Sequence, residues 1–314
     1  RRQRQMCIRD RVRFQYFEDC YKENAFLAED IRQTVQNGVP LSEIAVLFRT
    51  NMQPRALMEY MVSANLAFQT KDRIPDIYEH WIARDFFTYI RIAQGSDSRA
   101  DFLSIMNRPK RYIGRDSLPD ETVCFDEWMK LYEEQPWIAE RIEKLWYDLK
   151  HLSRLSPYAA INYIRRGIGY DDYLAEYAEY RNANKEDFYE VADEILASAK
   201  GYRTFEEWFA HIEEYRQELK RLAQEKRRNQ NAVTFATLHS AKGLEFTKVY
   251  LIDVNEGVMP YKKAVLKQDI EEERRLFYVG MTRAKESLTI CSVKKMRGKE
   301  VELSRFIKEA GKEP

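Results

Sequence analysis

The chain has 314 residues, and its 52 lysines and arginines nearly balance its 51 aspartates and glutamates. A hydrophobic fraction of 44% beside a charged fraction of 33% is typical of a soluble globular protein, and the length favours two domains. No apolar run approaches the ~18 residues of a membrane-spanning helix, and no secretory signal pattern opens the sequence, so we expect no membrane partner. The near-neutral charge also argues against a uniformly basic nucleic-acid coat.

Cysteine and histidine usage points away from metal binding. The four cysteines and four histidines form no CxxC or HxxxH pair. We therefore expect no metal site and no disulfide framework, and a reducing, cytoplasmic location fits this usage.

The first part of the chain alternates helical and strand patterns. Residues 1–12 carry five arginines and no period, so we expect a disordered or non-native lead-in. The continuous apolar run Ile44–Phe48 is typical of a strand buried on both faces, and Arg49 follows it directly. The other elements predicted before residue 94 are helices over about 21–36, 51–62 and 80–93 and a short strand over 66–68. This alternation over residues 13–93 predicts a layered sheet.

The middle of the chain shows no strand pattern. Residues 94–229 contain a series of amphipathic helices, the clearest of which places Trp208, Ile212 and Tyr215 at spacings of four and three. Strands return over 233–238, 249–254 and 288–293, with a helix over about 270–284 that Asp269 caps. We therefore expect an α/β fold in which residues 13–93 and 230–314 form one sheet domain, interrupted by an all-helical insertion over 94–229.

Polar side chains stand where the predicted elements end. Arg49 follows a strand, Thr237 and His239 open a loop that ends at Glu245, and Arg283 closes a helix. Phosphoryl transfer uses guanidinium groups to neutralise charge on a γ-phosphate. A surface ion pair for Arg49 and a helix-end position for Arg283 are the simpler interpretations of each residue alone.

Two residues of the loop have open roles. Glu245 could accept a hydrogen bond from a ribose hydroxyl, or it could form an ion pair with Lys242 or Lys248. We expect His239 to be a polar loop contact rather than a base, because no serine or cysteine nucleophile with a supporting acid accompanies it.

Three long segments together resemble one family. TLHSAKGLEF (237–246), KVYLIDVNEGVMP (248–260) and EERRLFYVGMTRAKE (272–286) resemble the C-terminal motor half of the UvrD/PcrA/Rep family of superfamily 1 DNA helicases. IAVLFRTNMQPRALMEYM (44–61) resembles the family's motif IV, NRPKRYIG (107–114) the start of its helical insertion, and LSRFIKE (303–309) its closing helix. The resemblance implies the second RecA-like domain, 2A, a parallel sheet of P-loop NTPase type without its own P-loop, split by the helical 2B domain.

The resemblance also implies roles for residues of this sequence. Arg49 and Arg283 would reach the γ-phosphate of ATP, and Glu245 would hold its ribose. Thr237 and His239 would lie in the loop that links bound single-stranded DNA to the nucleotide cleft.

The resemblance also implies supporting roles for residues near the nucleotide cleft and in the 2B domain. Tyr278 and the run 272–275 would buttress the nucleotide cleft. In the 2B domain, Arg108, Lys110 and Arg111 would contact duplex phosphates, and Tyr112 would either stack on DNA or pack internally.

The sequence departs from the whole family pattern in one respect. It has no GxxxxGK[ST] loop and no apolar strand that ends in a paired Asp-Glu for magnesium and the attacking water. The family carries both on its first RecA-like domain. We therefore expect ATP and Mg²⁺ to be bound mainly by that domain, outside this chain, and the chain alone to be inactive.

The expected whole protein is an ATP-dependent DNA translocase and helicase, 3′-to-5′, that acts in DNA repair or replication restart. Its partners would be single-stranded DNA, junctions of single- and double-stranded DNA, and its own N-terminal motor domain. Two alternatives stay open: a motor fragment of an AddA/RecB-like helicase–nuclease, and a non-catalytic DNA-binding or partner-docking module of the same fold. The second alternative predicts loss of Arg49, Glu245 or Arg283, and all three are present.

Overall fold

Two compact units make up the chain. The computed structural model describes residues 12–72, 74–225 and 231–311. Contacts between residues divide the chain into a first unit, residues 1–75 with 214–314, and a second unit, residues 76–213. In the described ranges, no helix combines the length and the apolar composition needed to cross a membrane.

The first unit is built on one sheet. The strand order is β1-β6-β5-β2-β4-β3 with every neighbouring pair parallel, and β7 pairs antiparallel with β6. The strands are β1 (Val12–Asp19), β2 (Ile44–Phe48), β3 (Phe68–Thr70), β4 (Val233–Thr237), β5 (Phe246–Leu251), β6 (Ala284–Met296) and β7 (Lys299–Glu300). The predicted α/β class with a parallel sheet is confirmed.

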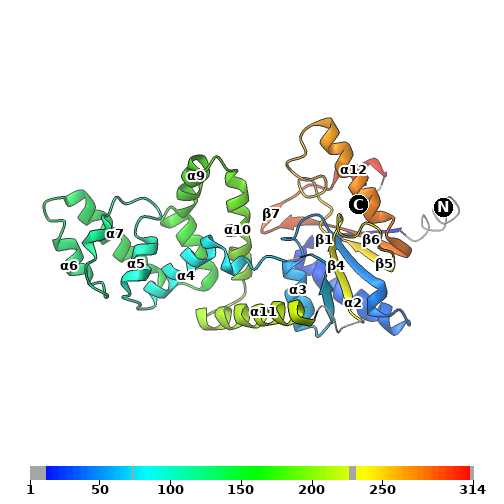
Figure 1. Ribbon diagram of the computed structural model, residues 1–314, viewed down its shortest axis with the longest axis horizontal. Helices are drawn as coiled ribbons and strands as arrows, with labels where there is room; N and C mark the ends of the chain where they lie inside the picture. Colours follow the sequence, from blue (N-terminus) through cyan, green and yellow to red (C-terminus); the bar gives the residue numbers. More distant parts are fainter. Residues whose placement is uncertain (1–11, 73, 226–230, 312–314) are drawn as a thin grey trace. The chain divides into compact units, whose positions relative to one another are not determined.

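Helices cover both faces of this sheet (Figure 1). Helices α2 (Cys20–Gln36) and α3 (Arg55–Ser63) cover one face, and α12 (Lys267–Met281) and α13 (Arg305–Glu309) cover the other. In β2, Ala45 and Leu47 join the apolar cluster on the α12 side, while the alternate side chains point to the opposite face. All five residues of β2 are buried, so a strand in this position requires a continuous apolar run rather than alternation.

Among its described residues, the second unit has helices joined by loops and no strand, apart from one isolated bridge between Ser98 and Thr122. Its helices are α4 (Trp81–Ala93), α5 (Arg99–Ile105), α6 (Phe125–Lys130), α7 (Pro136–Leu152), α8 (Pro157–Asn162), α9 (Tyr170–Tyr180), α10 (Lys185–Ser198) and the first part of α11 (Phe205–Glu225). The short helical turns of the chain are η1 (Leu41–Glu43) in the first unit and η2 (Ile77–Glu79), η3 (Arg115–Ser117) and the π-helix η4 (Tyr163–Gly167) in the second.

Strand β1 is a feature that the sequence pattern does not predict. It is the outermost strand of the parallel order, and none of its residues is fully buried, so its side chains show neither a continuous apolar run nor clean alternation. Val12 belongs to this strand and not to a disordered lead-in. The rest of the predicted lead-in, residues 1–11, lies outside the described residues.

The units also divide at other points than the predicted domain boundaries. The divisions fall at 75/76 and 213/214, whereas the sequence pattern places them at 93/94 and 229/230. Helix α4 accounts for the first difference, because its Phe86 packs on Tyr170 and its Phe87 on Trp208, both in the second unit. Helical periodicity reveals that a helix has a buried face but not which unit covers that face.

Helix α12 begins at Lys267, three residues before the predicted start. Leu266 occupies the N-cap position, and the Asp269 carboxylate, inside the first turn, accepts a hydrogen bond from the Leu266 N–H at 3.2 Å. Asp269 therefore stabilises the helix start, but the prediction that it is the N-cap residue is wrong.

Candidate functional site

Polar residues gather at the carboxyl ends of neighbouring strands. Arg49 follows β2 and Leu238 follows β4, and the two strands pair so that the Leu238 N–H donates to the Phe48 carbonyl at 2.9 Å. Asp72 lies beyond the end of β3, and Asp253 beyond the end of β5. Open α/β sheets bind ligands outside the carboxyl ends of their strands. This topology brings Arg49 beside the start of the 238–245 loop.

The Arg49 guanidinium has a fixed orientation. Its Nε donates to both carboxylate oxygens of Glu273 at 3.1 and 3.0 Å, and its Nη2 donates to Glu273 Oε1 at 2.8 Å. Glu273, on α12, is only 7% exposed and also accepts from the Tyr261 N–H at 3.0 Å. The Tyr261 ring lies over the guanidinium, 5.2 Å from ring centroid to Cζ. Arg49 thus forms a partly buried ion pair, and not a mobile surface one.

The main chain at Arg49 is fixed as well. The N–H groups of Arg49 and Thr50 both donate to Gln53 Oε1, at 2.8 and 2.7 Å. The Gln53 amide nitrogen donates to Asp253 Oδ2 at 3.4 Å. Gln53 is a residue that the sequence pattern does not single out.

A buried acidic cluster lies behind this contact. The Asp253 N–H donates to Glu23 Oε1 at 3.3 Å, and Cys20 Sγ lies 3.9 Å from Asp253 Oδ1. Burial, followed by the neighbouring Asp253 carboxylate, raises the pKa of Glu23 well above its ordinary value. Each of the three side chains already contacts another group of the first unit, so we assign no ion to this cluster.

The loop after β4 is held from β3. The Thr237 N–H donates to Asp72 Oδ2 at 2.7 Å, and the Ser240 hydroxyl donates to Asp72 Oδ1. The Ser240 N–H in turn donates to Thr237 Oγ1 at 3.2 Å. Thr237 is 9% exposed, whereas the His239 side chain is exposed. Asp72 is a second residue missed from the sequence, since only the pairing of β3 with β4 reveals its place.

Arg283 and Glu245 lie together at the other end of the loop. The Arg283 guanidinium donates to the carbonyls of Leu244 and Val279, each at 2.9 Å, and the Arg283 carbonyl accepts from the Phe246 N–H at 2.9 Å. Glu245, next to these contacts, is exposed and has no hydrogen-bond or ion-pair partner among the described residues. The alternative partner Lys248 pairs instead with Asp30, at 2.5 Å.

The main chains of the two arginines lie at opposite ends of the sheet. Arg49 follows β2, whereas Arg283 precedes β6, and the five-residue strand β2 is roughly 16 Å long. Both guanidinium groups nevertheless contact α12, Arg49 at Glu273 and Arg283 at Val279. Six residues of helix correspond to roughly 9 Å along its axis. The two contacted positions, Glu273 and Val279, are thus separated by roughly that distance along α12.

The other predicted buttress residues differ in their surroundings. Within the run 272–275, Glu273 contacts Arg49, while Glu272 and Arg275 are exposed. Arg274 pairs with Glu309, in α13, at 2.9 Å. Tyr278 is 49% exposed on the same helix.

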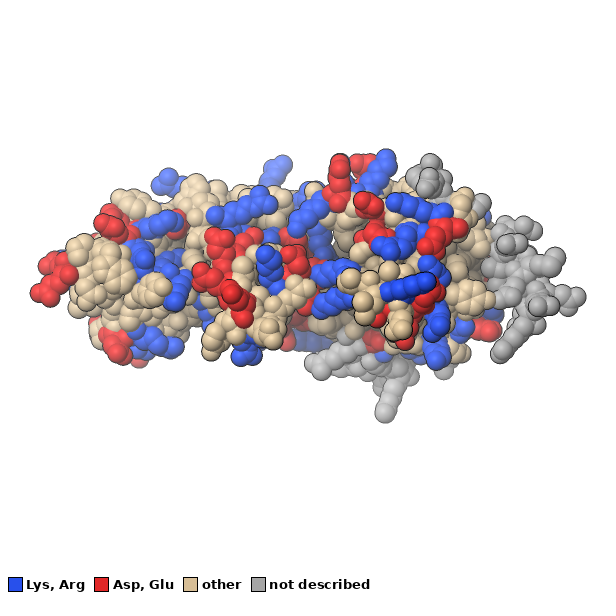
Figure 2. Space-filling view, turned by 90° about the horizontal axis from the view of Figure 1, so that it is seen from above, with Lys and Arg blue, Asp and Glu red and all other residues tan. Residues whose placement is uncertain are grey.

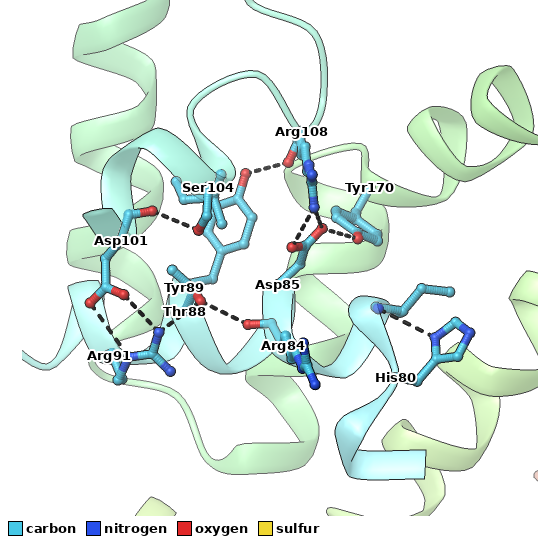
Figure 3. Close-up of polar contacts among 12 residues, drawn as sticks. His80, Arg84, Asp85, Thr88, Tyr89, Arg91, Asp101, Ser104, Arg108 and Tyr170 are labelled. Carbon is cyan, nitrogen blue, oxygen red and sulfur yellow. Dashed lines mark hydrogen bonds and ion pairs between the residues drawn. The ribbon is translucent and has the colours of Figure 1, made fainter. Parts of the chain in front are cut away.

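In the second unit, Arg108 belongs to a polar network with α4 and α9. Its Nη1 donates to both oxygens of Asp85, at 2.8 and 2.9 Å, and the Tyr170 hydroxyl donates to Asp85 Oδ2 at 2.6 Å (Figure 3). Burial raises the pKa of Asp85, although the hydrogen bonds from Tyr170 and Arg108 oppose the shift. The Arg108 side chain is 39% exposed, so part of it is available to a ligand.

Arg111 does not face solvent. It is 7% exposed, its Nη1 donates to the carbonyls of Ile105 and Met106 at 3.2 and 3.0 Å, and its Nη2 donates to the Tyr89 hydroxyl at 3.1 Å. The prediction that Arg111 contacts DNA phosphates therefore needs correction: its guanidinium braces the loop from within. Its neighbour Lys110 is exposed.

Tyr112 presents its ring at the surface beside two cations. It is 56% exposed and has a φ of 60°, a left-handed conformation that is unusual for a bulky residue. Lys110 Nζ lies 4.7 Å and Arg141 Cζ 5.2 Å from its ring centroid.

Over the face shown in Figure 2, basic and acidic side chains are interspersed, in keeping with the net charge of +1.

Comparison with known proteins places these sites in a family context. The chain matches the family described as the UvrD-like helicase C-terminal domain over residues 3–123 and 128–295. It is 27% identical over 306 residues to the proposed ATP-dependent DNA helicase YjcD of Bacillus subtilis, covering 93% of this chain and 39% of that protein. It is 28% identical to ATP-dependent DNA helicase PcrA of Bacillus subtilis, with 87% of this chain and 40% of that protein covered.

A third relative agrees with these two. ATP-dependent DNA helicase Rep of Salmonella typhimurium is 27% identical, with 87% of this chain and 44% of that protein covered. The chain thus spans about two fifths of the length of these relatives, and the family match extends over most of both units. The chain belongs to the UvrD-like helicase C-terminal domain family.

Proposed function

We propose that the whole protein to which this chain belongs is an ATP-dependent DNA helicase and translocase that moves 3′-to-5′ in DNA repair or replication restart. The chain would supply the 2A domain from its first unit and the 2B domain from its second. ATP and Mg²⁺ would be bound mainly by an N-terminal motor domain with a phosphate-binding loop, and the protein would work in the cytoplasm. The observation that carries the proposal is the attachment of both Arg49 and Arg283 to one helix, α12.

The two arginines would act on the terminal phosphate of ATP. In phosphoryl transfer, negative charge spreads over the γ-phosphate oxygens, and planar guanidinium groups stabilise it at fixed positions. The described carboxylates nearest Arg49 are already engaged, Glu273 by Arg49 itself and Asp253 by Gln53. These residues fit the role of charge stabilisers and not that of magnesium ligands, which supports placing Mg²⁺ on the other motor domain.

The 238–245 loop would couple nucleotide to DNA. Its Glu245 end touches Arg283, which favours a contact between Glu245 and the ribose. Its Thr237 end is tied to Asp72, and the exposed His239 is available to single-stranded DNA. In this proposal a ligand at either end shifts one continuous loop.

The second unit would meet duplex DNA at junctions of single and double strands. Lys110 is exposed, and Arg108 is partly exposed and shared with Asp85, so both suit phosphate contacts. Tyr112 has the exposure needed for stacking. Arg111 would support this surface by holding the loop behind it.

Substitutions of Arg283 and Arg49 in the whole protein test the proposal. Arg283→Lys keeps the charge but loses the planar fork, so DNA-stimulated ATP hydrolysis should fall by about 10³-fold while ATP binding changes little. Arg49→Ala should cause a loss of similar order. Arg13→Lys is the matched control, because Arg13 is an exposed arginine of β1 outside the proposed site, and it should leave turnover unchanged.

Near-normal hydrolysis in both Arg283→Lys and Arg49→Ala would refute the arginine roles. Retained DNA binding with no DNA-stimulated hydrolysis by the whole wild-type protein would favour a non-catalytic DNA-binding module instead.

A further inference from the structure

Two aromatic side chains of the second unit meet at its surface. Tyr112, in the loop after α5, is 56% exposed, and Trp137, in the first turn of α7, is 49% exposed. Their ring centroids are 6.3 Å apart, with an angle of 67° between the ring planes. Exposed apolar residues that stand singly are normal, but these two rings are in contact and form one continuous aromatic surface.

Two cations accompany these rings. Arg141 Cζ lies 5.2 Å from the Tyr112 centroid and 4.9 Å from the Trp137 centroid, and Arg141 Nη1 donates to the Arg111 carbonyl at 3.1 Å. Lys110 Nζ lies 4.7 Å from the Tyr112 centroid. Neither cation forms an ion pair with a carboxylate of the described residues, so both charges are available to an anion. We refer to Lys110, Tyr112, Trp137 and Arg141 as the aromatic platform.

The loop that carries Tyr112 is fixed from within. Asn107 Nδ2 donates to the Ile113 carbonyl at 2.8 Å, and Asn107 Oδ1 accepts from the N–H groups of Arg111 and Ile113 at 3.2 and 3.1 Å. Tyr112 stands between these two buried residues and has a φ of 60°, which is costly for a bulky side chain. Residues held in such conformations cluster at ligand sites. The loop thus keeps the Tyr112 ring at the surface.

Exposed rings beside unpaired cations suit one class of ligand. Proteins that bind single-stranded nucleic acid combine aromatic rings, on which bases stack, with basic groups that contact the phosphates. Bases inside a duplex are stacked on both faces, whereas an unpaired base can turn a face to the protein. Among the described residues, only Tyr112 and Arg141 place a ring or a cation against Trp137, and half of this side chain remains open to a base.

We infer that the aromatic platform binds an unpaired base of single-stranded DNA. Trp137 and Tyr112 form the stacking surface, and Lys110 and Arg141 contact the phosphates that flank the base. The inference rests on the proposed function, because a helicase produces single strands next to the duplex that it opens. It adds Trp137 and Arg141 to the DNA-binding residues and assigns Tyr112 to a base.

Photocrosslinking of the whole protein tests the inference at single residues. The probe is a DNA duplex with a single-stranded tail in which 5-iododeoxyuridine replaces thymidine, and mass spectrometry identifies the crosslinked residues. Iodouracil crosslinks readily to aromatic side chains on which it stacks. We expect crosslinks at Trp137 or Tyr112. Tyr147 is the control, because it is 58% exposed on the same helix but lies outside the platform, and it should not crosslink.

Affinity for DNA gives a second measurement. Trp137→Ala combined with Tyr112→Ala should raise Kd for the tailed duplex by about 5- to 140-fold, which corresponds to the loss of one stacked base. The same variant should leave Kd for a blunt duplex unchanged, which also shows that it is folded. Trp137→Phe keeps an aromatic ring and should lose less affinity than Trp137→Ala. Tyr147→Ala should bind both DNAs like wild type.

Three outcomes would overturn the inference. Crosslinks elsewhere in the protein, with none at Trp137 or Tyr112, would place the unpaired strand at another surface. An equal loss of affinity for tailed and blunt DNA would assign the rings to duplex binding. Unchanged affinity for both DNAs would remove the rings from the DNA interface. Failure of the proposed function gives a different result, since the wild-type protein would then show no DNA-stimulated ATP hydrolysis, whether or not the platform crosslinks.

Discussion

The contact between Gly280 and Leu238 gives a sharp test of the first unit's packing. Gly280 lies on the buried face of α12, where an added Cβ would be 2.4 Å from Leu238 Cδ2 and 3.2 Å from Leu251 Cδ2. Carbon atoms in contact are about 3.5 Å or more apart, so Leu238 would have to move by about 1 Å. The perturbation we choose is Gly280→Val, which adds two further methyl groups at this point.

The packing around Gly280 determines how much the free energy of unfolding should fall. Overpacking a core costs about 1–3 kcal/mol. Leu238 and Leu251 line a cavity of about 10 Å³, which is too small to absorb a displaced side chain, so we take the upper part of that range. Valine regains about 0.5 kcal/mol of helix propensity over glycine. Gly280→Val should therefore lower the free energy of unfolding by about 1.5 to 2.5 kcal/mol.

Urea unfolding of this chain, followed by two probes, measures the effect. All five tryptophans lie within residues 76–213, so their fluorescence reports the second unit, while circular dichroism reports both units. Gly280→Val should shift the dichroism transition more than the fluorescence transition. Arg275→Val, at an exposed position of α12, is the control and should cost about 0.5 kcal/mol or less.

The Leu238→Ala background identifies the cause. Leu238→Ala alone should cost about 2–5 kcal/mol, because it empties a buried site. With Gly280→Val added, the combined loss should be smaller than the sum by at least about 1 kcal/mol, since the clashing atoms are gone. A Gly280→Val loss below about 0.5 kcal/mol, or strict additivity with Leu238→Ala, would refute the close approach of α12 to the loop.

Three further predictions concern the pH dependence of stability and the second unit. Burial raises the pKa of Glu23 in the folded chain above the value of about 4.3 that a glutamate has in the unfolded chain. The folded chain therefore keeps this proton to higher pH than the unfolded chain does. As pH rises above about 4.3, the free energy of unfolding should fall by up to about 1.4 kcal/mol per pH unit, until Glu23 ionises in the folded chain as well. Glu23→Gln should remove this slope in urea unfolding at stepped pH, and an unchanged slope would exclude Glu23 as its source. Arg111→Ala should destabilise the tryptophan-reported unit by about 2 kcal/mol, as it leaves the Tyr89 hydroxyl and several carbonyls without their donor. Lys110→Ala should leave stability unchanged but lower the salt slope of DNA binding by the whole protein by about 1, and an unchanged slope would remove Lys110 from the interface.

The elements with strong local patterns could be predicted from the sequence. The run Ile44–Phe48 identified β2 because a strand covered on both faces needs apolar residues at every position. Strand β1 could not be found in this way, since its register with β6 is set by a pairing between residues about 276 apart, as in Val12 with Leu288. The sequence of an outer strand, which is buried only in part, gives little indication of the strand with which it pairs.

Some features of the candidate site could likewise be predicted from the sequence, and others could not. The positions of Arg49 and Arg283 followed from the ends of predicted elements, but the partner of Arg49 did not, since Glu273 lies 224 residues away in sequence. Lys110 and Arg111 are adjacent cations with opposite surroundings: the first is exposed, and the second is buried against backbone carbonyls. Charge is a property of the sequence, whereas burial depends on how the helices of the second unit pack.

Helix α12 is the element through which the proposed ligands would influence one another. Its Glu273 holds Arg49, its Val279 carbonyl holds Arg283, and its Gly280 lies against Leu238, one residue before His239. Packed contacts of this kind move as units rather than deforming gradually. If DNA bound at His239 and shifted the loop, Leu238 would press directly on the backbone of α12, because Gly280 has no side chain. The resulting movement of α12 would displace Glu273 and the Val279 carbonyl, and with them both arginines. Coupling in this protein would then require no movement within the sheet, because loop and helix already touch.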